Sequence, residues 1–518
     1  MLAILSPSDL NRSMRGTAEE QGSFTAIDVL CEELLDDEGF LVTLREARGT
    51  VFSDEDFDVL YPSDRGRPSH PPSVLAALLL AQIFYGVSDR EAERRTRVDL
   101  SWKDALGLPL EHRGIPHVCL VEFRARVVRG EMAGFFNDKL LQLAKRAGVI
   151  GHRRVVDSTG IADCVVTMDT VSLIRSATRR CLDVLGKLDK RIGGATRAAL
   201  VRTDYDERSK PEINWSSATE RQELVTELCR DAAVVIEACG TINEPVLDEA
   251  AELLRVVAAQ DVEDDDKGGF AIRQGVARDR VISTVDVDAR HGHRSRSDRY
   301  DGFKAHLVAD VDSDLITAAS ASKATTSDEE ILPELIEADP LAVAEVIADT
   351  HYGAAKTRVA LGASGIELVA PAPPASSKRD FFSKGDFTID LEDGAVTCPA
   401  GVTVAISRTS KAKRTDVRFG EHCTSCHLRT KCTTRRAGRI VEINPAEELL
   451  LSARKARWTP EFRDRYRERA RIERKNAQLK FRTQKIPWRG LVKADAWVKL
   501  RVAALNMDRI GRMPGLIG

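Results

Sequence analysis

The chain has 518 residues, of which 43% are hydrophobic, 30% charged and 5% aromatic. This composition is typical of a globular protein with several domains and excludes collagen-like and wholly disordered classes. The longest apolar stretch, residues 74–84, is too short to span a bilayer and is interrupted by Gln82. Residues 1–5 lack the basic residues and the cleavage site of a signal peptide. We therefore expect a cytoplasmic protein with no membrane partner.

The charge is distributed unevenly along the chain. The net charge of the whole sequence is −3. Residues 401–518, however, hold 29 Lys and Arg against 11 Asp and Glu, a net charge of +18, which leaves −21 for the remainder. A segment this basic suggests a polyanionic partner, and we favour DNA. The alternative is a basic helix that is simply solvated.

The first 149 residues are predicted to be helical. Residues 74–85 form an apolar helix that ends at Gly86, and Ser88 then caps a basic helix, with Glu91 in the capping-box position. A helix, a short turn and a basic helix are compatible with a DNA-reading unit, but the same arrangement commonly joins two packed helices. A further helix is predicted from about residue 120 to residue 147.

Strand patterns begin at residue 153 and alternate with helical ones. A buried strand is predicted at 153–159, followed by mostly helical periodicity over 165–260. The next predicted elements are a hairpin of strands 303–310 and 315–320, a helix at 327–337, a strand at 344–349, a helix from about 353 and a strand at 365–370. This alternation predicts an α/β fold.

The last part of the chain has a different character. Residues 370–377 have the composition of a linker, and residues 378–450 are predicted to be rich in β-strands. A long basic helix is predicted from Thr459 and Pro460 to about residue 481, and a last helix covers 494–506.

Two aspartates, Asp157 and Asp349, are each preceded by apolar strand residues. We expect both to lie where their strands end, so that they meet at one edge of a sheet. Two carboxylates held close together repel each other unless a divalent cation lies between them. Oxygen ligands of this kind suit Mg²⁺ or Mn²⁺. Either aspartate alone could simply cap a turn.

The basic helix carries a second pattern. On one continuous helix, with about 100° per residue, the four side chains of this pattern fall within a sector of about 60°. They are Tyr466, Arg469, Glu473 and Lys480. A surface helix with intrahelical ion pairs would explain the charges, but not the occurrence of these residues after two strand aspartates.

The order of strand aspartate, strand aspartate and helix glutamate, with Tyr-x₂-Arg-x₃-Glu-x₆-Lys around the glutamate, resembles the DDE transposases of bacterial insertion sequences. Further segments that resemble this group are residues 85–91, 102–107, 291–306 and 349–353. The resemblance extends over nearly the whole chain from about residue 60 onward.

This resemblance implies a ribonuclease H-like catalytic domain over residues 150–518, with a mixed sheet and flanking helices. An all-helical domain that binds DNA ends would precede it at residues 1–149. Because 191 residues separate Asp157 from Asp349, a helical insertion is expected at about 165–285. A second insertion, rich in β-strands and containing a cysteine cluster, is expected at about 375–455.

The resemblance also implies an activity, that of a DNA transposase. Such an enzyme binds the terminal inverted repeats of its insertion sequence, cleaves DNA and transfers strands by two-metal phosphoryl transfer. Asp157, Asp349 and Glu473 would be catalytic and hold Mg²⁺ or Mn²⁺. Transposon ends and target DNA would be the partners, and a homodimer would bridge two ends. The residues implied to bind DNA phosphates are Tyr466, Arg469 and Lys480.

Two other activities remain open from the sequence. The chain could be a transposase-derived DNA-binding protein that has lost catalysis, or a ribonuclease H-like nuclease that cuts without joining. The complete triad argues against the first of these, because an unused site is free to change.

Ten cysteines are present, and without a secretion signal we expect no disulfides among them. Six that stand singly are predicted to be small buried hydrophobic residues: Cys31, Cys119, Cys164, Cys181, Cys229 and Cys239. The other four have the residue count of a structural zinc site: Cys398, Cys423, Cys426 and Cys432. His422 or His427 could replace one ligand. The alternative is a set of reduced thiols in a loop.

Overall fold

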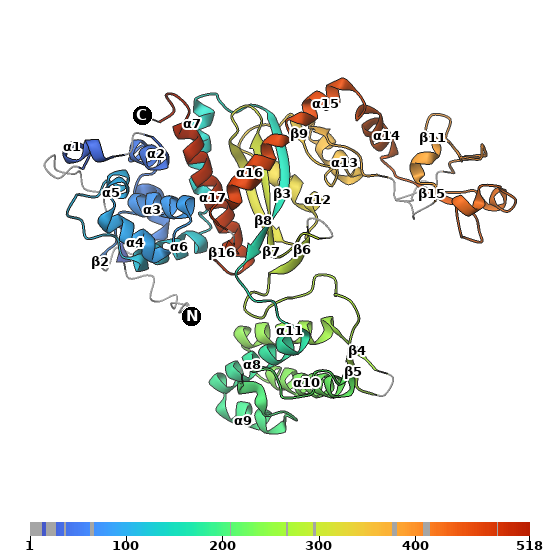
Figure 1. Ribbon diagram of the computed structural model, residues 1–518, viewed down its shortest axis with the longest axis horizontal. Coiled ribbons are helices and arrows are strands. Elements are labelled where there is room, and N and C mark those ends of the chain that lie inside the picture. The colour runs from blue at the N-terminus through green and yellow to red at the C-terminus, as the bar shows by residue number, and fades with distance from the viewer. Residues whose placement is uncertain are drawn as a thin grey trace.

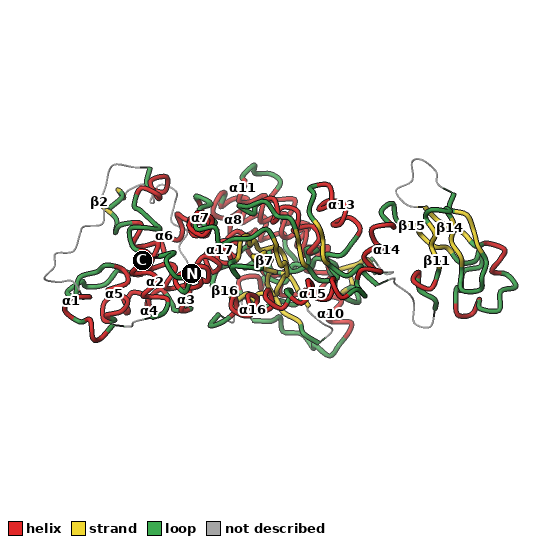
Figure 2. The backbone as a smooth tube through the Cα atoms, turned by 90° about the horizontal axis from the view of Figure 1, so that it is seen from above, coloured by secondary structure: helices red, strands yellow, loops and turns green. Residues whose placement is uncertain are grey.

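The computed structural model describes residues 13–16, 27–35, 38–62, 67–207, 209–265, 268–293, 297–374, 381–407, 415–483 and 485–517. Figure 1 shows a central sheet, N-terminal helices on one side of it, a bundle of helices below it and a small lobe on the opposite side. Seen from above in Figure 2, the molecule is long, with the N-terminal helices and the small lobe at its two ends.

Short helices dominate the N-terminal region. Its main helices are α2 (Phe40–Ala47), α3 (Pro72–Tyr85), α4 (Asp89–Val98), α5 (Leu100–Leu106), α6 (His117–Arg129) and α7 (Phe135–Arg146). Gly86 ends α3 with a φ of 65°, and the Ser88 hydroxyl accepts a hydrogen bond from the Glu91 amide, as predicted. The single helix predicted over 120–147 is wrong, because the chain turns between Gly130 and Gly134 and forms α6 and α7 instead.

Smaller elements complete this region: β1 (Ser13–Met14), α1 (Ile27–Leu30), the 3₁₀ turns Glu32–Leu34 and Glu55–Leu60, and β2 (Arg67–Pro68). No single described helix is long and apolar enough to cross a membrane. By length and composition the pair α3 and α4 passes that test together, but the two helices are bent by 114° at their junction.

The C-terminal helix α17 (Leu491–Gly511) joins the N-terminal helices to the sheet. On one side its Leu500, Ala503 and Met507 belong to the same hydrophobic core as the N-terminal helices. On the other side Trp497 and Val502 pack in the core beneath the sheet. The helix is therefore buried on two faces, one covered by the N-terminal helices and the other by the central sheet.

The central sheet has seven strands, with β3 (Arg153–Asp163) in the middle. β7 (Arg299–Asp310) runs antiparallel to β3, and both β6 (Arg290–His293) and β8 (Ile316–Lys323) pair with β7. On the other side of β3 lie β9 (Glu345–Ile347), then β10 (Glu367–Val369), both parallel to it. β16 (Lys485–Ile486) pairs with the last residues of β3. The predicted hairpin and the two later strands are confirmed.

Both faces of the sheet are covered by helices. α16 (Ala470–Lys480) and α17 pack on one face. α12 (Asp328–Glu337) and α13 (Ala355–Ala363) pack on the other. Successive residues of β3 alternate between them, because Val155 belongs to the first core and Val156 to the second. The predicted mixed α/β class is confirmed.

The bundle below the sheet lies between β3 and β6 in the sequence. It contains α8 (Thr170–Leu188), α9 (Lys190–Ala199), α10 (Ala218–Cys239) and α11 (Pro245–Gln260), with a 3₁₀ turn at Asp204–Asp206 and the hairpin of β4 (Val262–Asp264) and β5 (Phe270–Ile272). These helices pack around a hydrophobic core of their own, as Leu182, Leu228 and Leu254 illustrate. The helical periodicity of 165–260 is thus confirmed.

The small lobe is built from short strands and turns. The strands are β11 (Thr388–Asp390), β12 (Ala395–Thr397), β13 (Thr403–Ala405), β14 (Thr415–Arg418) and β15 (Ile440–Ile443), and the 3₁₀ turns are Lys384–Asp386, Gly420–Cys423 and Arg429–Lys431. They form a three-stranded and a two-stranded antiparallel sheet. The chain returns to the central sheet through α14 (Glu447–Ala456).

The long basic helix is divided into α15 (Pro460–Arg467) and α16, so the prediction of one continuous helix is wrong. At the junction the amides of Glu468, Arg469, Arg471 and Ile472 bond to carbonyls three residues back. This tighter winding rotates the side chains on the two helices relative to each other. The 60° sector computed for a uniform helix therefore does not apply.

Candidate active site

The pairing of β3 with β9 brings two aspartates side by side. Arg153 lies opposite Glu345, and Val155 lies opposite Ile347. Continuing this parallel register by two residues places Asp349 beside Asp157, on the same face as Val155 and Ile347. That face is covered by α16. Asp349 follows its strand as predicted, whereas Asp157 lies in the middle of β3, because pairing with β7 continues as far as Ala162.

The carboxylate of Asp157 is contacted by two side chains, one from α16 and one from the residue that precedes it. Its Oδ2 accepts a hydrogen bond of 3.0 Å from Asn476 Nδ2, and Arg469 Nη2 lies 3.6 Å from the same oxygen. Burial raises the pKa of Asp157 to about 6; Arg469 opposes this effect, and the charge of Asp349 adds to it. The ionised pair is therefore unfavourable in the folded protein unless more positive charge comes near it.

Asp349 is oriented by His351, two residues further along the chain. Its Oδ1 accepts from the His351 amide at 2.8 Å, and its Oδ2 lies 2.9 Å from the His351 ring Nδ1. This hydrogen bond raises the pKa of His351. The carboxylate of Asp349 thus has a fixed direction at the end of β9.

Glu473 lies on α16 and has a different environment. Its side chain is 60% exposed and forms an ion pair of 2.9 Å with Arg469 Nη1. Arg469 therefore stands between Glu473 and Asp157. Within the described ranges, no three or more His, Cys, Asp or Glu side chains form a group that could hold a metal ion as they are arranged. Asp157 and Asp349 of the predicted triad are neighbours, and Arg469 separates the third carboxylate, Glu473, from Asp157.

The other predicted residues extend the site along β3. Tyr466 on α15 stacks on Phe462, with ring centroids 5.4 Å apart, and burial raises the pKa of Tyr466. Lys480, the last residue of α16, donates a hydrogen bond of 2.9 Å to the hydroxyl of Thr159. Since Thr159 is two residues beyond Asp157, both lie on the face that α16 covers.

Sequence reasoning missed three residues of this site: Asn476, His351 and Asp328. Asn476 is three residues after Glu473, so helical spacing could have identified it. Asp328, at the start of α12, accepts hydrogen bonds from Ser158 Oγ at 2.9 Å and Lys304 Nζ at 2.8 Å. Its charge also raises the pKa of Asp157. No local pattern identifies Asp328, because only the sheet brings it close.

The donors at this site fit a hard divalent cation. Asp157 and Asp349 supply neighbouring carboxylate oxygens, the ligand type that Mg²⁺ and Mn²⁺ prefer. In the described part of the chain, the buried Oδ1 of Asn476 has no hydrogen-bond partner. Burial is the main cause of the raised pKa of Asp157 and the charge of Asp349 a smaller one, and a cation at this position would offset both effects.

The ten cysteines are all free thiols in this structure. Of the six single cysteines, Cys181 and Cys239 are buried as predicted, and Cys31, Cys119 and Cys229 are partly buried. Cys164 is exposed, so the prediction for it is wrong; it directly follows the last residue of β3. The four clustered cysteines lie together in the small lobe, far from the aspartates (Figure 1).

Two family models match the chain. One, described as a transposase DDE domain, matches residues 397–511, and the other, described as a transposase domain (DUF772), matches residues 30–126. The first covers Glu473 and its helix, and the second covers most of the N-terminal helices; Asp157 and Asp349 lie outside both. No curated protein and no solved structure matches the chain.

Both matching models describe transposases. They confirm, at two separate parts of the sequence, the resemblance to insertion-sequence DDE transposases. The mixed sheet with helices on both faces is consistent with the ribonuclease H-like fold of that group. The Tyr-Arg-Glu-Lys signature is not tested by these matches and stays a prediction.

Proposed function

We propose that this protein is a DNA transposase that binds the terminal inverted repeats of its insertion sequence and catalyses DNA cleavage and strand transfer. The observation that carries this proposal is the parallel register that makes Asp157 and Asp349 neighbours beneath the helix of Glu473. Three carboxylates from two strands and one helix are the side chains that a metal-dependent phosphoryl transfer requires.

Asp157, Asp349 and Glu473 would hold Mg²⁺ or Mn²⁺. When bound, these ions lower the pKa of the attacking water or 3′-hydroxyl and offset the charge on the leaving oxygen. Glu473 must first exchange its ion pair with Arg469 for the metal. Asn476 keeps the Asp157 carboxylate in place throughout.

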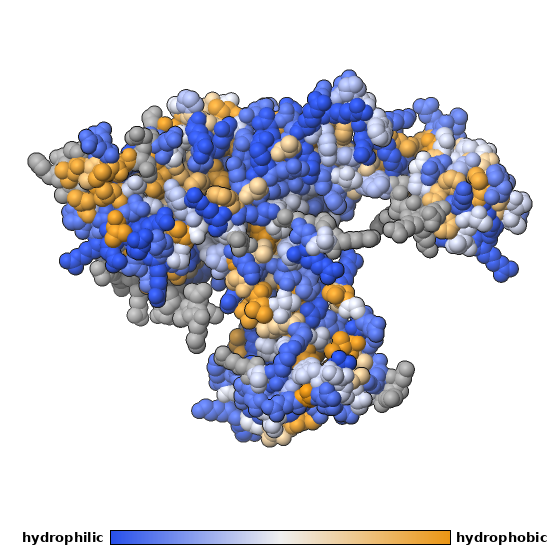
Figure 3. Space-filling model, viewed as in Figure 1, coloured by the Kyte–Doolittle hydropathy of each residue, from blue (hydrophilic) through white to orange (hydrophobic). Residues whose placement is uncertain are grey.

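Tyr466, Arg469 and Lys480 would bind the phosphates of the transposon end. Arg469 can present its guanidinium to two phosphate oxygens at once, whereas Lys480 acts as a single positive charge. Figure 3 shows hydrophilic residues gathered over α15 and α16, the helices that carry these three side chains. This surface would place the scissile phosphate over the two aspartates.

We assign the two parts of this function to two domains. Residues 150–518 would form the ribonuclease H-like catalytic domain, with insertions at about 165–285 and 375–455. Residues 1–149 would bind DNA ends, and α4 offers three exposed arginines for this: Arg90, Arg94 and Arg97. The active form would be a homodimer that bridges two ends.

The test is a cleavage and joining assay on the inverted repeats that flank the gene. The full chain is incubated with these ends and Mg²⁺ and compared with Asp157→Asn and Glu473→Gln. We expect the unaltered chain to cut and join, and both variants to bind ends without cutting. Glu468→Gln is the matched control, because Glu468 lies five residues before Glu473 but pairs with Arg471 instead.

Each outcome separates the alternatives. Cleavage that survives in both variants would exclude the proposed site. Specific end binding without cleavage by the unaltered chain would indicate a DNA-binding protein that has lost catalysis. Cleavage without joined products would indicate a nuclease.

A further inference from the structure

The small lobe, residues 382–443, stands away from the rest of the molecule (Figures 1 and 2). Its strands have three or four residues each. Among its described residues eight apolar side chains are buried in one cluster, and two of these are Cys423 and Cys432. A unit below about 70 residues rarely holds its fold with a hydrophobic core alone and commonly contains a metal ion or disulfides. This lobe therefore needs a further source of stability.

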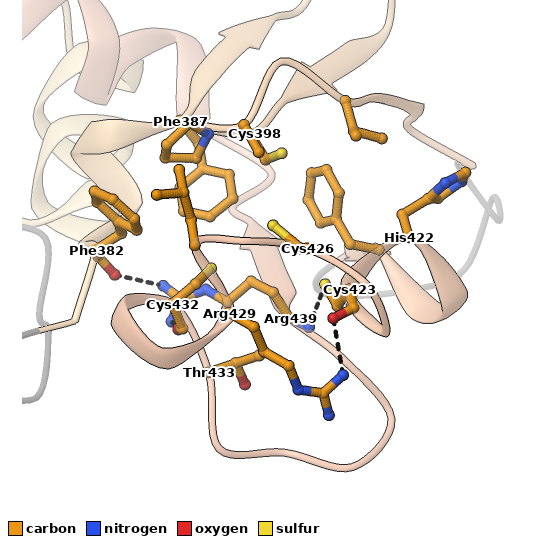
Figure 4. A pocket seen from close by; sticks show the side chains of 15 residues that line it. Phe382, Phe387, Cys398, His422, Cys423, Cys426, Arg429, Cys432, Thr433 and Arg439 are labelled. Carbon is orange, nitrogen blue, oxygen red and sulfur yellow. Dashed lines mark hydrogen bonds between the residues drawn. The ribbon is translucent and has the colours of Figure 1, made fainter.

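Four cysteines lie around one cavity of this lobe, although in their present directions they do not yet form a group that could hold a metal ion. Cys398, Cys423, Cys426 and Cys432 line one cavity of about 20 Å³, which is room for an object the size of a water molecule (Figure 4). They come from three separate segments: the end of β12, the 3₁₀ turn 420–423 with the residues after it, and the end of the turn 429–431.

The surroundings of these thiols favour an anionic sulfur cluster. The Arg439 amide donates a hydrogen bond of 3.4 Å to Cys423 Sγ. Hydrogen bonds from neighbouring groups to the ligands are a regular feature of metal sites. The guanidinium groups of Arg429 and Arg439 donate to the carbonyls of Cys423 and Cys432, at 2.8 and 3.2 Å. Two positive charges thus lie at the cluster.

A glycine permits the close approach of the amide to the sulfur. Gly438 has a φ of 83°, and a Cβ at this position would lie 2.6 Å from the Gly420 carbonyl oxygen and 3.2 Å from Cys423 Cβ. Any other residue would therefore push the segment with Arg439 away from Cys423.

We propose that the lobe binds one structural zinc ion through Cys398, Cys423, Cys426 and Cys432. Each thiol loses its proton on binding, which gives a closed tetrahedral site of net charge −2 beside Arg429 and Arg439. Zinc–sulfur bonds are about 2.3 Å long, so the four side chains must turn toward the cavity centre from their present directions. The ion would link the three segments that carry these cysteines.

The histidines that the spacing left as possible ligands do not fit as well. His422 lines the cavity, but in Figure 4 its ring points away from the sulfur atoms. His427 is not among the residues that line the cavity. The structure therefore favours four sulfur ligands over three sulfurs and a nitrogen.

The experiment purifies the full chain without chelators and measures its zinc content by elemental mass spectrometry. We expect one zinc per chain, and a loss of most of it in each of Cys398→Ser, Cys423→Ser, Cys426→Ser and Cys432→Ser. Cys229→Ser and Cys164→Ser are the controls, because both residues lie outside the lobe, and they should keep the ion. Absence of zinc from the unaltered chain, or zinc content that none of the four variants changes, would overturn the proposal.

A second measurement covers variants that fail to fold. The chelated chain is titrated with Co²⁺, which takes the place of zinc and absorbs light through its bonds to thiolates. One equivalent should produce the thiolate-to-metal absorption of a tetrahedral site, and zinc should then displace it. A chain that shows no such absorption, or that has disulfides between these cysteines, would contradict the proposal. Neither readout depends on transposase activity.

Discussion

The guanidinium of Arg501 donates a hydrogen bond of 2.8 Å to the main-chain oxygen of Ile83, 418 residues earlier in the chain. The same side chain also donates to the carbonyls of Phe84, Gln478, Leu479 and Phe481. These five acceptors belong to the last turns of α3 and α16, where helix carbonyls lack partners within the helix. Arg501 is 1% exposed and thereby ties the helix of Glu473 to the N-terminal helices.

Replacing Arg501 with Met should destabilise the protein strongly. The substitution keeps most of the apolar volume but leaves five buried or half-buried carbonyl oxygens without this donor, at a cost of about 3 kcal/mol or more. We expect a lower midpoint of urea unfolding, followed by the fluorescence of the tryptophans. Arg512→Met is the control, because Arg512 is exposed and its ion pair is with Asp508, four residues earlier on the same helix surface. Equal midpoints for the two variants would contradict this role.

Asp157→Asn should stabilise the metal-free protein at neutral pH. The folded-state pKa of Asp157, about 6, is above the ordinary value of about 3.9, so the folded state holds this proton more tightly. Its contribution to stability is complete at low pH and is lost as the pH rises from about 4 to about 6.

An uncharged Asn escapes that loss. In a chelating buffer at pH 7.5 we expect the variant to melt at a higher temperature than the unaltered chain. Its free energy of unfolding should be larger by about 2 kcal/mol. The difference should shrink at pH 4.5, and adding Mg²⁺ should stabilise only the unaltered chain. A variant that is less stable at pH 7.5 would show that Asp157 is not strained when ionised.

Arg469→Gln should weaken binding of transposon ends in a salt-dependent way. If Arg469 contacts one phosphate, the slope of log affinity against log salt should fall by about one. Arg467→Gln is a matched control from the same helix junction, because its side chain is 79% exposed and pairs with Asp464. An equal change of slope in both variants would mean that the site contributes only general positive charge.

Arg154→Leu should be among the most damaging substitutions in the sheet. Arg154 forms ion pairs with Asp310 at 2.8 Å and Asp339 at 2.7 Å, and all three side chains are 0% exposed. Removing the arginine leaves two buried carboxylates without their cation, which typically costs about 3 to 5 kcal/mol. We expect a large fall in the melting temperature, whereas Arg153→Gln, which removes a half-exposed pair with Glu345, should have little effect.

The sequence predicted those features that depend on local pattern. The strand after His152, the hairpin through Ser313 and the cap at Ser88 depend on neighbouring residues, and all three are confirmed. The extension of β3 beyond Thr159 was missed because pairing with β7, not local composition, maintains it. The winding change near Arg469 was missed for a similar reason, since a helical period assumes uniform geometry.

The site shows the same division. Sequence reasoning proposed the two aspartates and the residues of the basic helix as the site. The register of β3 and β9 explains why the two aspartates lie side by side. It did not predict that Arg469 separates Glu473 from Asp157, because side-chain directions at a helix junction depend on tertiary contacts. Asp328 was missed because tertiary contacts, such as its hydrogen bonds with Ser158 and Lys304, bring it close to the site.

The position of α17 has a consequence for the order of folding during synthesis. The N-terminal helices bury Leu78, Phe136 and their neighbours in a core that Leu500, Ala503 and Met507 complete. These N-terminal helices leave the ribosome first, yet the part of their core that α17 covers stays open until residues 491–511 have also emerged. A ribosome that stalls before this helix would therefore release a chain with an open core at one end and an unsupported sheet beside it, a target for chaperones and proteases.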